Sequence, residues 1–518
     1  MRRTFVGQAI WSPAIARLSL LAIVVAAALT NSACIVGPNY AKPSTPVAAS
    51  FKEPLPLNFK EAQGWKQGEP KDDLHRGKWW EVFNDATLNG LEEQIDVNNQ
   101  TLAAAEAQFR QARAAIRVAH SGLYPVLTGG ASALGTGTSG TLTSTRSVGA
   151  TQYPVLTIPN VGATWTPDLW GQIRRTIESA TDTAQASAAD LENARLSIQG
   201  EVALDYFQLR GQDAQKQLLD STVKAYEDAL RLTQNRYNQG VASQVDVVQA
   251  QTQLEQTRAQ STDTEVTRQQ FEHAIAILIG KPPSQLTIPM SPVAAPTAPA
   301  AANIPAVPGV IPSELLERRP DIAGNERRVA AANAQIGVAI SAYYPTLSLG
   351  ASGGLEGSSL LSLFTWPSRF WSLGPSLSET ILDFGRRRGL TEEAQAAYDQ
   401  TVANYRETVL TAFQNVEDEL STLRILERES GQQADAVRYA ERSLELANAQ
   451  YTGGITTYLQ VITAQTFALQ NELTAVQLNT RRITASVSLI QALGGGWDVS
   501  KLPSGKDVTP AYGGKNTK

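Results

Sequence analysis

The sequence predicts a mixed α+β fold that is predominantly α and is built by internal duplication. From Ile173 to Leu209, apolar or small residues recur at a mean spacing of about 3.6 residues, the period of an α-helix. No proline interrupts residues 172–236, so at about 1.5 Å of rise per residue this helix would be roughly 100 Å long. The stripe from Ala180 to Leu209 recurs 214 positions later as Ala394 to Leu423. Each half of the chain therefore contains one long helix.

Composition excludes several classes of protein. The chain has 518 residues, of which 42% are hydrophobic and 18% charged, so it is neither disordered nor an ordinary inner-membrane protein. It is long enough to bury a large core. The formal net charge is -5. Because no basic excess is present, we expect no nucleic-acid partner.

Residues 1–33 read as an export signal, with a basic start, an apolar stretch at 18–29 and small residues before Cys34. Cys34 is the only cysteine, which excludes an intrachain disulfide and a cysteine metal cluster. A lone cysteine directly after an export signal predicts a lipoprotein acylated at Cys34, for example by palmitate. The alternative is simple cleavage after Ala33, and Asn31 stands where lipoprotein signals usually have leucine. No later apolar run of about 18 residues follows, so we expect no membrane helix in the mature chain.

Two blocks have the character of strands. Residues 126–164 and 346–380 are rich in Gly, Ser and Thr, and in the second block Leu347 and Leu349 alternate with small polar residues. Each block has room for two strands of about ten residues, enough to cross a bilayer when tilted. Aromatic residues such as Trp165 and Trp366 bracket both blocks. The alternatives are a soluble hairpin with core aromatics and a membrane β-barrel with interfacial aromatic girdles.

The strand count favours a barrel shared between copies. Two hairpins supply four strands per chain, whereas bacterial single-chain barrels start at about eight. A barrel in lipid must close completely, because an open edge leaves backbone groups unpaired in hydrocarbon. We therefore expect a membrane β-barrel to which each copy contributes four strands.

Each long helix is predicted to end in a glycine turn. Residues 236–240 correspond to 450–454, with glycine where a helix C-cap favours the left-handed conformation. Return helices then run to Leu278 and Leu493, and Ser243 with Asp246 and Thr457 with Gln460 resemble capping boxes. These tips lie farthest from the strands, where a partner's helical hairpin could dock. The candidate contact residues are Arg236, Tyr237, Asn238, Gly240, Tyr451, Thr452, Gly453 and Gly454. The plainer interpretation is that Gly240 and Gly454 serve only chain reversal.

The predicted organisation follows the duplication. It comprises a signal peptide (1–33), an extended lipoprotein tail (34–88), a first helix (89–122), a first β-hairpin (123–168), a long helix with tip and return helix (169–281), a Pro/Ala-rich linker (282–312), a helix of the second repeat (313–342), a second β-hairpin (343–383), a second long helix with tip and return helix (384–494) and a C-terminal tail (495–518). The extra residues of the first hairpin region are expected in a loop.

Several motifs together carry a family resemblance. They are Cys34 followed by Val36-Gly37-Pro38-Asn39-Tyr40, then Trp79-Trp80, Leu123-Tyr124-Pro125, Leu316-Glu317-Arg318-Arg319-Pro320-Asp321-Ile322, Tyr344-Pro345 and Ala492-Leu493-Gly494-Gly495-Gly496-Trp497. In this order they resemble TolC-like outer membrane factors, in particular the NodT-type lipoprotein branch of tripartite efflux systems. The resemblance covers nearly the whole mature chain.

The resemblance implies a homotrimer whose twelve strands close one outer-membrane β-barrel and whose long helices form a periplasmic α-barrel. It implies the exit duct of a multidrug-type efflux pump of a Gram-negative bacterium, which passes small molecules to the outside. The implied partners are outer-membrane lipid, a periplasmic adaptor and an inner-membrane transporter of the RND type. The alternatives are a duct for type I protein secretion and a fibrous coiled-coil protein or adhesin. Sustained heptads with a period of 3.5 would be expected of a coiled coil.

The resemblance also indicates where the duct would narrow. Well-studied relatives carry an Arg and two Asp at the second tip, and the matching positions here are Thr456, Gln460 and Thr463. In the first repeat, Asp246 occupies a matching acidic position. The candidate periplasmic constriction therefore comprises Asp246, Gln460 and Thr463, with helix capping as the alternative role of Asp246.

No catalytic site is predicted. The three histidines, His75, His120 and His273, lack the spacing of metal ligands. The sequence has no nucleophile motif and no phosphate-binding glycine loop. We therefore expect a protein that is not an enzyme and has no metal or cofactor.

Overall fold

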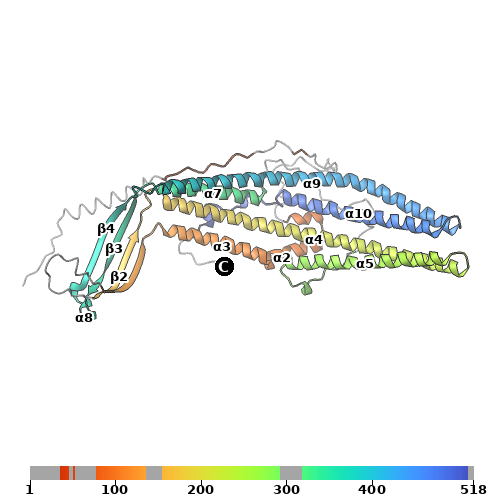
Figure 1. The fold of residues 1–518 in the computed structure, drawn as a ribbon, viewed down its shortest axis with the longest axis horizontal. Coiled ribbons are helices and arrows are strands. Elements are labelled where there is room, and N and C mark those ends of the chain that lie inside the picture. The colour runs from red at the N-terminus through yellow and green to blue at the C-terminus, as the bar shows by residue number, and fades with distance from the viewer. Residues whose placement is uncertain (1–34, 46–50, 53–77, 136–153, 292–317, 511–518) are drawn as a thin grey trace, which may run out of the picture.

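The computed structural model describes residues 35–45, 51–52, 78–135, 154–291 and 318–510. The molecule is elongated, with a β-sheet at one end and helices that run side by side toward the other (Figure 1). The helices turn back at the end opposite the sheet, so the strands and the helix tips are the two extremes of the chain.

The internal duplication is visible in the helix bounds. The long helices α4 (Gln172–Asn238) and α9 (Arg386–Thr452) each have 67 residues. Their return helices α5 (Gln244–Leu278) and α10 (Tyr458–Ala492) each have 35. Before the strands, α3 (Gln100–Ser121) and α7 (Pro320–Ser341) each have 22. The predicted predominantly α fold with two long helices is therefore confirmed.

The strands form one antiparallel sheet in the order β1-β2-β3-β4. Their bounds are Val126–Gly135, Pro154–Trp165, Thr346–Gly357 and Arg369–Ser378. The two halves of the chain meet where β2 pairs with β3, and β1 and β4 are the edges. Within the single chain the sheet is open at both sides.

The pairing shows where the two hairpins differ in length. Val126 pairs with Thr164 and Thr346 pairs with Ser378, so both hairpins have equivalent bases. The difference must lie at the far ends of the strands. There, β3 and β4 are joined by two short helices, α8 (Leu360–Leu363) and η6 (Trp366–Ser368). The longer connection 136–153 of the first hairpin lies outside the described residues.

Two departures from the expected elements occur near the N-terminus. Residues 89–122 do not form one helix, because α2 (Ala86–Asn98) ends before α3 begins. At Asn99 the backbone is extended (φ -67°, ψ 122°), and its side chain accepts a hydrogen bond from the Leu102 amide, which caps α3. The segment expected to be an extended tail also contains a 3₁₀ helix, η3 (Trp79–Phe83), and the start of α2.

The largest apolar cluster lies midway along the molecule. Val202, Tyr206 and Leu209 of α4 pack there with Trp79 and Ile275, and all five are buried. The Tyr206 hydroxyl donates to Asp85 Oδ2 at 2.6 Å, which ties α4 to the N-cap residue of α2. Further short elements, η4 (Pro283–Gln285), η7 (Val499–Lys501) and α11 (Gly505–Val508), follow α5 and α10. The helical body is thus held at its middle by segments from both repeats.

Candidate functional site

The helix tips are the first candidate site. Gly240 and Gly454 have φ of +75° and +72°, the left-handed conformation predicted for them. The Val241 amide donates to the Arg236 carbonyl at 2.8 Å, and the Ile455 amide donates to the Gln450 carbonyl at 2.9 Å. This is the Schellman pattern in both repeats, so each long helix ends in the same closed turn.

The predicted contact residues differ in accessibility. Tyr237, Asn238, Thr452 and the three tip glycines are exposed. Arg236 is half-buried, and Tyr451 is only 7% exposed. A partner could therefore reach the exposed set directly, whereas Tyr451 belongs to the packing beneath it.

Arg236 joins the two tips. Its guanidinium lies 4.7 Å from the centroid of the Tyr451 ring, and its Nη1 donates to the Thr452 carbonyl at 3.2 Å. A cation above an aromatic face is attracted by the negative potential of the ring. The first repeat is thereby attached to the end of the long helix of the second.

Tyr451 continues this contact into the interior of the tip. Its ring lies 5.2 Å from that of Tyr458, and both pack with Ala250 and Val461 in a buried cluster. Burial raises the pKa of Tyr458 to about 12, and the negative charge of Asp246 acts in the same direction. The cluster combines residues of α5, α9 and α10, so it fixes the return helices relative to each other.

The candidate constriction residues lie on the first two turns of the return helices. Asp246 forms the predicted capping box, because its Oδ2 accepts from the Ser243 amide at 3.1 Å and its own amide donates to Ser243 Oγ at 3.2 Å. The second predicted box is wrong, since Thr457 makes no side-chain cap bond. Gln460 and Thr463 are exposed, and the Thr463 hydroxyl donates to the Leu459 carbonyl of its own helix.

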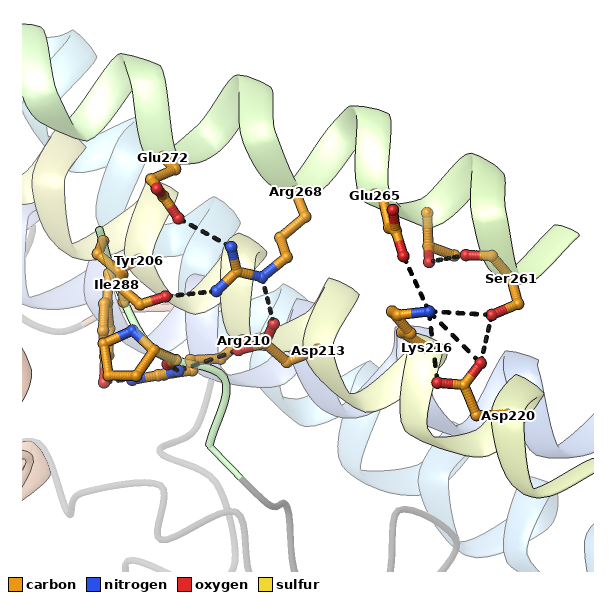
Figure 2. Close-up of polar contacts among 12 residues, drawn as sticks. Tyr206, Arg210, Asp213, Lys216, Asp220, Ser261, Glu265, Arg268, Glu272 and Ile288 are labelled. Carbon is orange, nitrogen blue, oxygen red and sulfur yellow. Dashed lines mark hydrogen bonds and ion pairs between the residues drawn. The ribbon is translucent and has the colours of Figure 1, made fainter. Parts of the chain in front are cut away.

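A buried charge cluster, missed by the sequence analysis, lies between α4 and α5 (Figure 2). The Asp213 side chain is 1% exposed and accepts from Arg210 Nη1 at 2.9 Å and from Arg268 Nε at 2.7 Å. The two arginines also donate to the carbonyls of Pro289 and Ile288, at 2.8 and 2.6 Å. The segment after α5 is therefore bound across the helix pair. The only signal in the sequence was the spacing of Arg210 and Asp213 on one helix face.

The strand end is the second candidate site. Trp371, Leu373 and Leu377 of β4 are 81%, 76% and 70% exposed, so one face of this strand presents large apolar side chains. At the base of the sheet the Trp170 ring stacks on Tyr344 with centroids 4.8 Å apart, and its Nε1 donates to the Pro345 carbonyl at 2.7 Å. Two aromatic residues that flank the strand blocks, Trp170 and Tyr344, thus meet where strands and helices join, whereas Trp366 lies in η6 at the far end of β3 and β4.

The segment that follows Cys34 is held at the same place. The Val36 amide donates to the Trp170 carbonyl at 3.1 Å. Arg175, which is 3% exposed, donates to the carbonyls of Val36 and Gly37, both at 3.3 Å, and to Asn39 Oδ1 at 3.2 Å. Cys34 itself lies outside the described residues. The chain directly after it is fixed beside the first turn of α4.

Two other features are absent from the described residues. No group of three or more His, Cys, Asp or Glu side chains able to hold a metal ion is found in the ranges that the structure describes. None of the described helices combines the length and apolarity needed to cross a membrane.

Comparison with known proteins gives a consistent set of matches. The model of the family described as "Outer membrane efflux protein" matches residues 91–281 and 311–495. The outer membrane protein OprJ of Pseudomonas aeruginosa is 32% identical over 491 residues, which is 94% of this chain and 97% of that protein. The toluene efflux pump outer membrane protein TtgI of Pseudomonas putida is 31% identical over 479 residues, covering 92% and 98%.

Solved structures show the same similarity. The outer-membrane channel OprN superimposes with a TM-score of 0.78 at 29% identity, covering 90% of this chain and all of that one. The order of helices, strands and tips is therefore shared over nearly the whole length.

Proposed function

The chain belongs to the outer membrane efflux protein family and is an outer-membrane channel of a tripartite efflux pump, and on this premise we propose that three copies form one continuous conduit. In this proposal the twelve strands close a β-barrel in the outer membrane. The long helices surround a tunnel that reaches into the periplasm.

The main observation that supports the assembly of three copies is the open sheet of the single chain. The edge strands β1 and β4 have unpaired backbone groups along their outer sides. In hydrocarbon these groups must be paired, because no water is available to satisfy them. Pairing β4 of one copy with β1 of the next, around a ring of three, satisfies every edge and exceeds the minimum of about eight strands.

Lipid contact is supported by the composition of the strand surface. Trp371, Leu373 and Leu377 extend from one face of β4 and are largely exposed in the single chain. Side chains on the other face would line the lumen, as alternation along a strand requires. Burial of this apolar face in acyl chains removes the exposed hydrophobic surface from water.

We further propose that Cys34 carries the lipid anchor. The chain from Val36 onward is bound to Trp170 and Arg175, at the junction of strands and helices. If the strands lie in the outer membrane, this junction lies at its periplasmic surface. A lipid attached to Cys34 would therefore enter the inner leaflet without any rearrangement of the segment that follows.

The tips are the proposed docking site of the periplasmic adaptor, with an RND-type transporter of the inner membrane below it. Tyr237, Asn238 and Thr452 are exposed beside closed glycine turns at the end farthest from the strands. A partner's helical hairpin can pack in the grooves between such tips. Asp246, Gln460 and Thr463 would then lie just inside the rim as the constriction.

The cargo is proposed to be small organic molecules. Two relatives are named for toluene efflux and for pyoverdine export, which are chemically different cargoes. A duct that accepts whatever the transporter delivers needs no specific binding pocket of its own. The choice of compound therefore rests with the partner transporter.

Two measurements test the proposal. The detergent-solubilised complex should have the mass of three chains, and a folded monomer would overturn the shared barrel. In planar bilayers the same material should form water-filled channels. A trimer without any conductance would overturn the conduit while leaving the assembly intact.

A further inference from the structure

One row of helices in the body of the molecule is interrupted. α7 and α10 follow one another along the molecule, and α4 and α9 pack against both of them (Figure 1). α10 ends at Ala492, and α7 begins at Pro320. The two ends are tied together, because Arg319 Nη1 donates to the Ala492 carbonyl at 2.9 Å. Gly494, with φ of +96°, passes so close to Arg318 that a Cβ there would overlap the Arg318 carbonyl oxygen.

A cavity of about 320 Å³ lies at this break and is lined by α4, α7, α9 and α10. Its volume is within the range of about 300–1,000 Å³ that is typical of small-molecule sites. A single metal ion would fill only a small part of it. All four walls belong to one chain, so the cavity does not depend on how copies assemble.

Two carboxylates of α9 give the cavity a negatively charged wall. Asp418 is exposed and Glu419 is half-buried. Within the described residues neither has an ion pair, and Asp418 accepts only from Gln414 Nε2, at 3.3 Å. The charges that α7 contributes compensate each other, because the Asp321 carboxylate accepts from Arg319 Nε at 3.0 Å and from Nη2 at 2.6 Å. The cavity therefore has an excess of negative charge.

Uncharged hydrogen-bonding groups line the α4 and α10 walls. In the part of the chain that the structure describes, the side chains of Asn193, Ser197 and Ser488 make no hydrogen bond. Gln491 donates from its Nε2 to the Leu196 carbonyl at 3.4 Å, which leaves its Oε1 as an acceptor. Amide and hydroxyl oxygens of this kind can accept from the N–H groups of a ligand.

The equivalent junction of the first repeat is less polar. There, too, the helix ends are tied together, since Asn99 Nδ2 donates to the Leu278 carbonyl at 2.6 Å. The positions equivalent to Ser488, Gln491 and Asp418 are Ala274, Ile277 and Leu204. The helix packing that the repeats share therefore does not require polar side chains at these positions.

We propose that this cavity binds a small organic cation with two ammonium groups, with the Asp418 and Glu419 carboxylates as its charge partners. The amide and hydroxyl oxygens of the α4 and α10 walls accept the remaining N–H groups. Hydrogen bonds between charged partners are stronger than those between neutral ones. The apolar linker of the ligand packs against Leu196 and Pro320. A bound dication contacts all four helices and so stabilises the break between α10 and α7.

The Glu419 carboxyl gives the site a pH dependence. Burial and the negative charge of Asp418 raise the pKa of Glu419 to about 7. The other charged groups at the cavity are Arg319 and Asp321 of α7, which pair with each other, and the α4 and α10 walls present no titratable side chain. A bound cation favours the ionised carboxylate and lowers this pKa. The affinity should therefore rise from about pH 6 to about pH 8, as Glu419 loses its proton.

Titration calorimetry of the full-length protein in a nonionic detergent tests the site, with 1,5-diaminopentane as the probe. The wild type should bind this dication and should not bind the uncharged 1,5-pentanediol. Glu419→Gln should weaken binding about tenfold or more and remove its pH dependence. Asp418→Asn, at an exposed position, should also weaken binding.

Two further variants test the location. Ser197→Trp places a large side chain in the cavity from an exposed position and keeps every charge, so it should abolish binding. Glu441→Gln removes an exposed carboxylate from the same helix as Glu419, nearer the tip, and should bind as the wild type does. Thermal unfolding without the probe checks that each variant is folded.

Several results would overturn the proposal. The first is a wild type that does not bind the diamine, and the second is an unchanged affinity in the Glu419, Asp418 and Ser197 variants. Binding of Mg²⁺ but not of the diamine, lost in Glu419→Gln, would identify a metal site instead. An affinity that does not change with pH would contradict the role of Glu419.

Discussion

The guanidinium of Arg236 at the end of α4 lies over the ring of Tyr451 at the end of α9, 4.7 Å from its centroid. The same side chain donates to the neighbouring Thr452 carbonyl at 3.2 Å. One arginine therefore attaches the tips of two long helices that are distant in sequence. In a shared tunnel, the separation of these tips sets the width of the periplasmic opening.

Replacing Arg236 by Ala should widen or loosen that opening. The cation–π contact contributes about 0.5–1 kcal/mol at a partly exposed site, and its loss removes one of the contacts between the first tip and the second. We expect a higher or more variable single-channel conductance in planar bilayers. Arg236→Lys, which keeps a cation above the ring, should lie between wild type and Ala. Identical traces for all three proteins would show that Arg236 has no influence on the opening.

Bulky substitutions at the tips should block docking. Trp at Asn238 or at Thr452 places a large side chain on an exposed surface, so the fold is preserved while the adaptor's approach is obstructed. Export in a strain that lacks its own copy should be lost, with an unchanged yield of trimer. Asp228→Trp, at an exposed position farther from the tip on the same helix, is the control and should export normally. Normal export by both tip variants would exclude this surface as the docking site.

Asp246 has two candidate roles that substitutions can separate. Three Asp246 carboxylates near one axis would repel each other and attract cations, so Asp246→Ala should change the conductance. Asp246→Asn removes the charge, but its side-chain oxygen can still accept from the Ser243 amide. If charge at the constriction matters, both variants should differ from wild type. If only Ala differs, the effect comes from the lost hydrogen bond between the Ser243 amide and the residue 246 side chain, which is one half of the capping box.

Cys34→Ser should abolish incorporation of radioactive palmitate. The trimer should persist, because the proposed barrel holds the protein in the membrane without the anchor. The measurement is labelling of cells followed by native mass determination of the purified protein. Absence of label in the wild-type protein would favour simple cleavage after Ala33.

Asp213→Ala should strongly destabilise the middle of the molecule. The Asp213 side chain is 1% exposed and compensates the charges of Arg210 and Arg268. Its removal takes the carboxylate away from the Arg210 guanidinium, whereas Arg268 keeps its ion pair with Glu272 at 2.8 Å. Breaking such a buried pair costs about 3–5 kcal/mol. Asp220→Ala is the matched control on the same helix. Its carboxylate is 53% exposed, and its ion pair with Lys216 contributes about 1 kcal/mol or less.

Thermal unfolding of the solubilised protein, followed by circular dichroism at 222 nm, distinguishes these two variants. The expected result is a much lower midpoint for Asp213→Ala than for Asp220→Ala. Equal midpoints would mean that the cluster in Figure 2 contributes little to holding the segment after α5.

The sequence by itself determined the repeated architecture. Helix periodicity, the recurrence of Ala180 to Leu209 and the glycines at 240 and 454 are local properties of the chain. The matching lengths of α4 and α9 and the left-handed turns at both tips follow directly from them. The strand blocks could be recognised from the sequence equally well. Their residues alternate with a period of two, which is typical of strands and differs from the period of 3.6 in the flanking helices.

The tertiary structure decided what local patterns could not. Apolar periodicity continues across Asn99, yet the backbone is extended there because the Asn99 side chain caps the next helix. Ser243 and Thr457 have nearly the same extended backbone, but only Ser243 forms its capping box. Capping depends on the orientation of individual side chains, which the sequence pattern does not specify.

Contacts between distant segments likewise could not be predicted from the sequence. The attachment of Arg236 to Tyr451 and the bonds from Arg210 and Arg268 to the segment after α5 join groups from separate elements. No periodicity encodes such pairs, because they form only once α4, α5, α9 and α10 have packed side by side. The position and length of each helix are therefore set by the local sequence, whereas the partners of its charged side chains are set by how the helices pack.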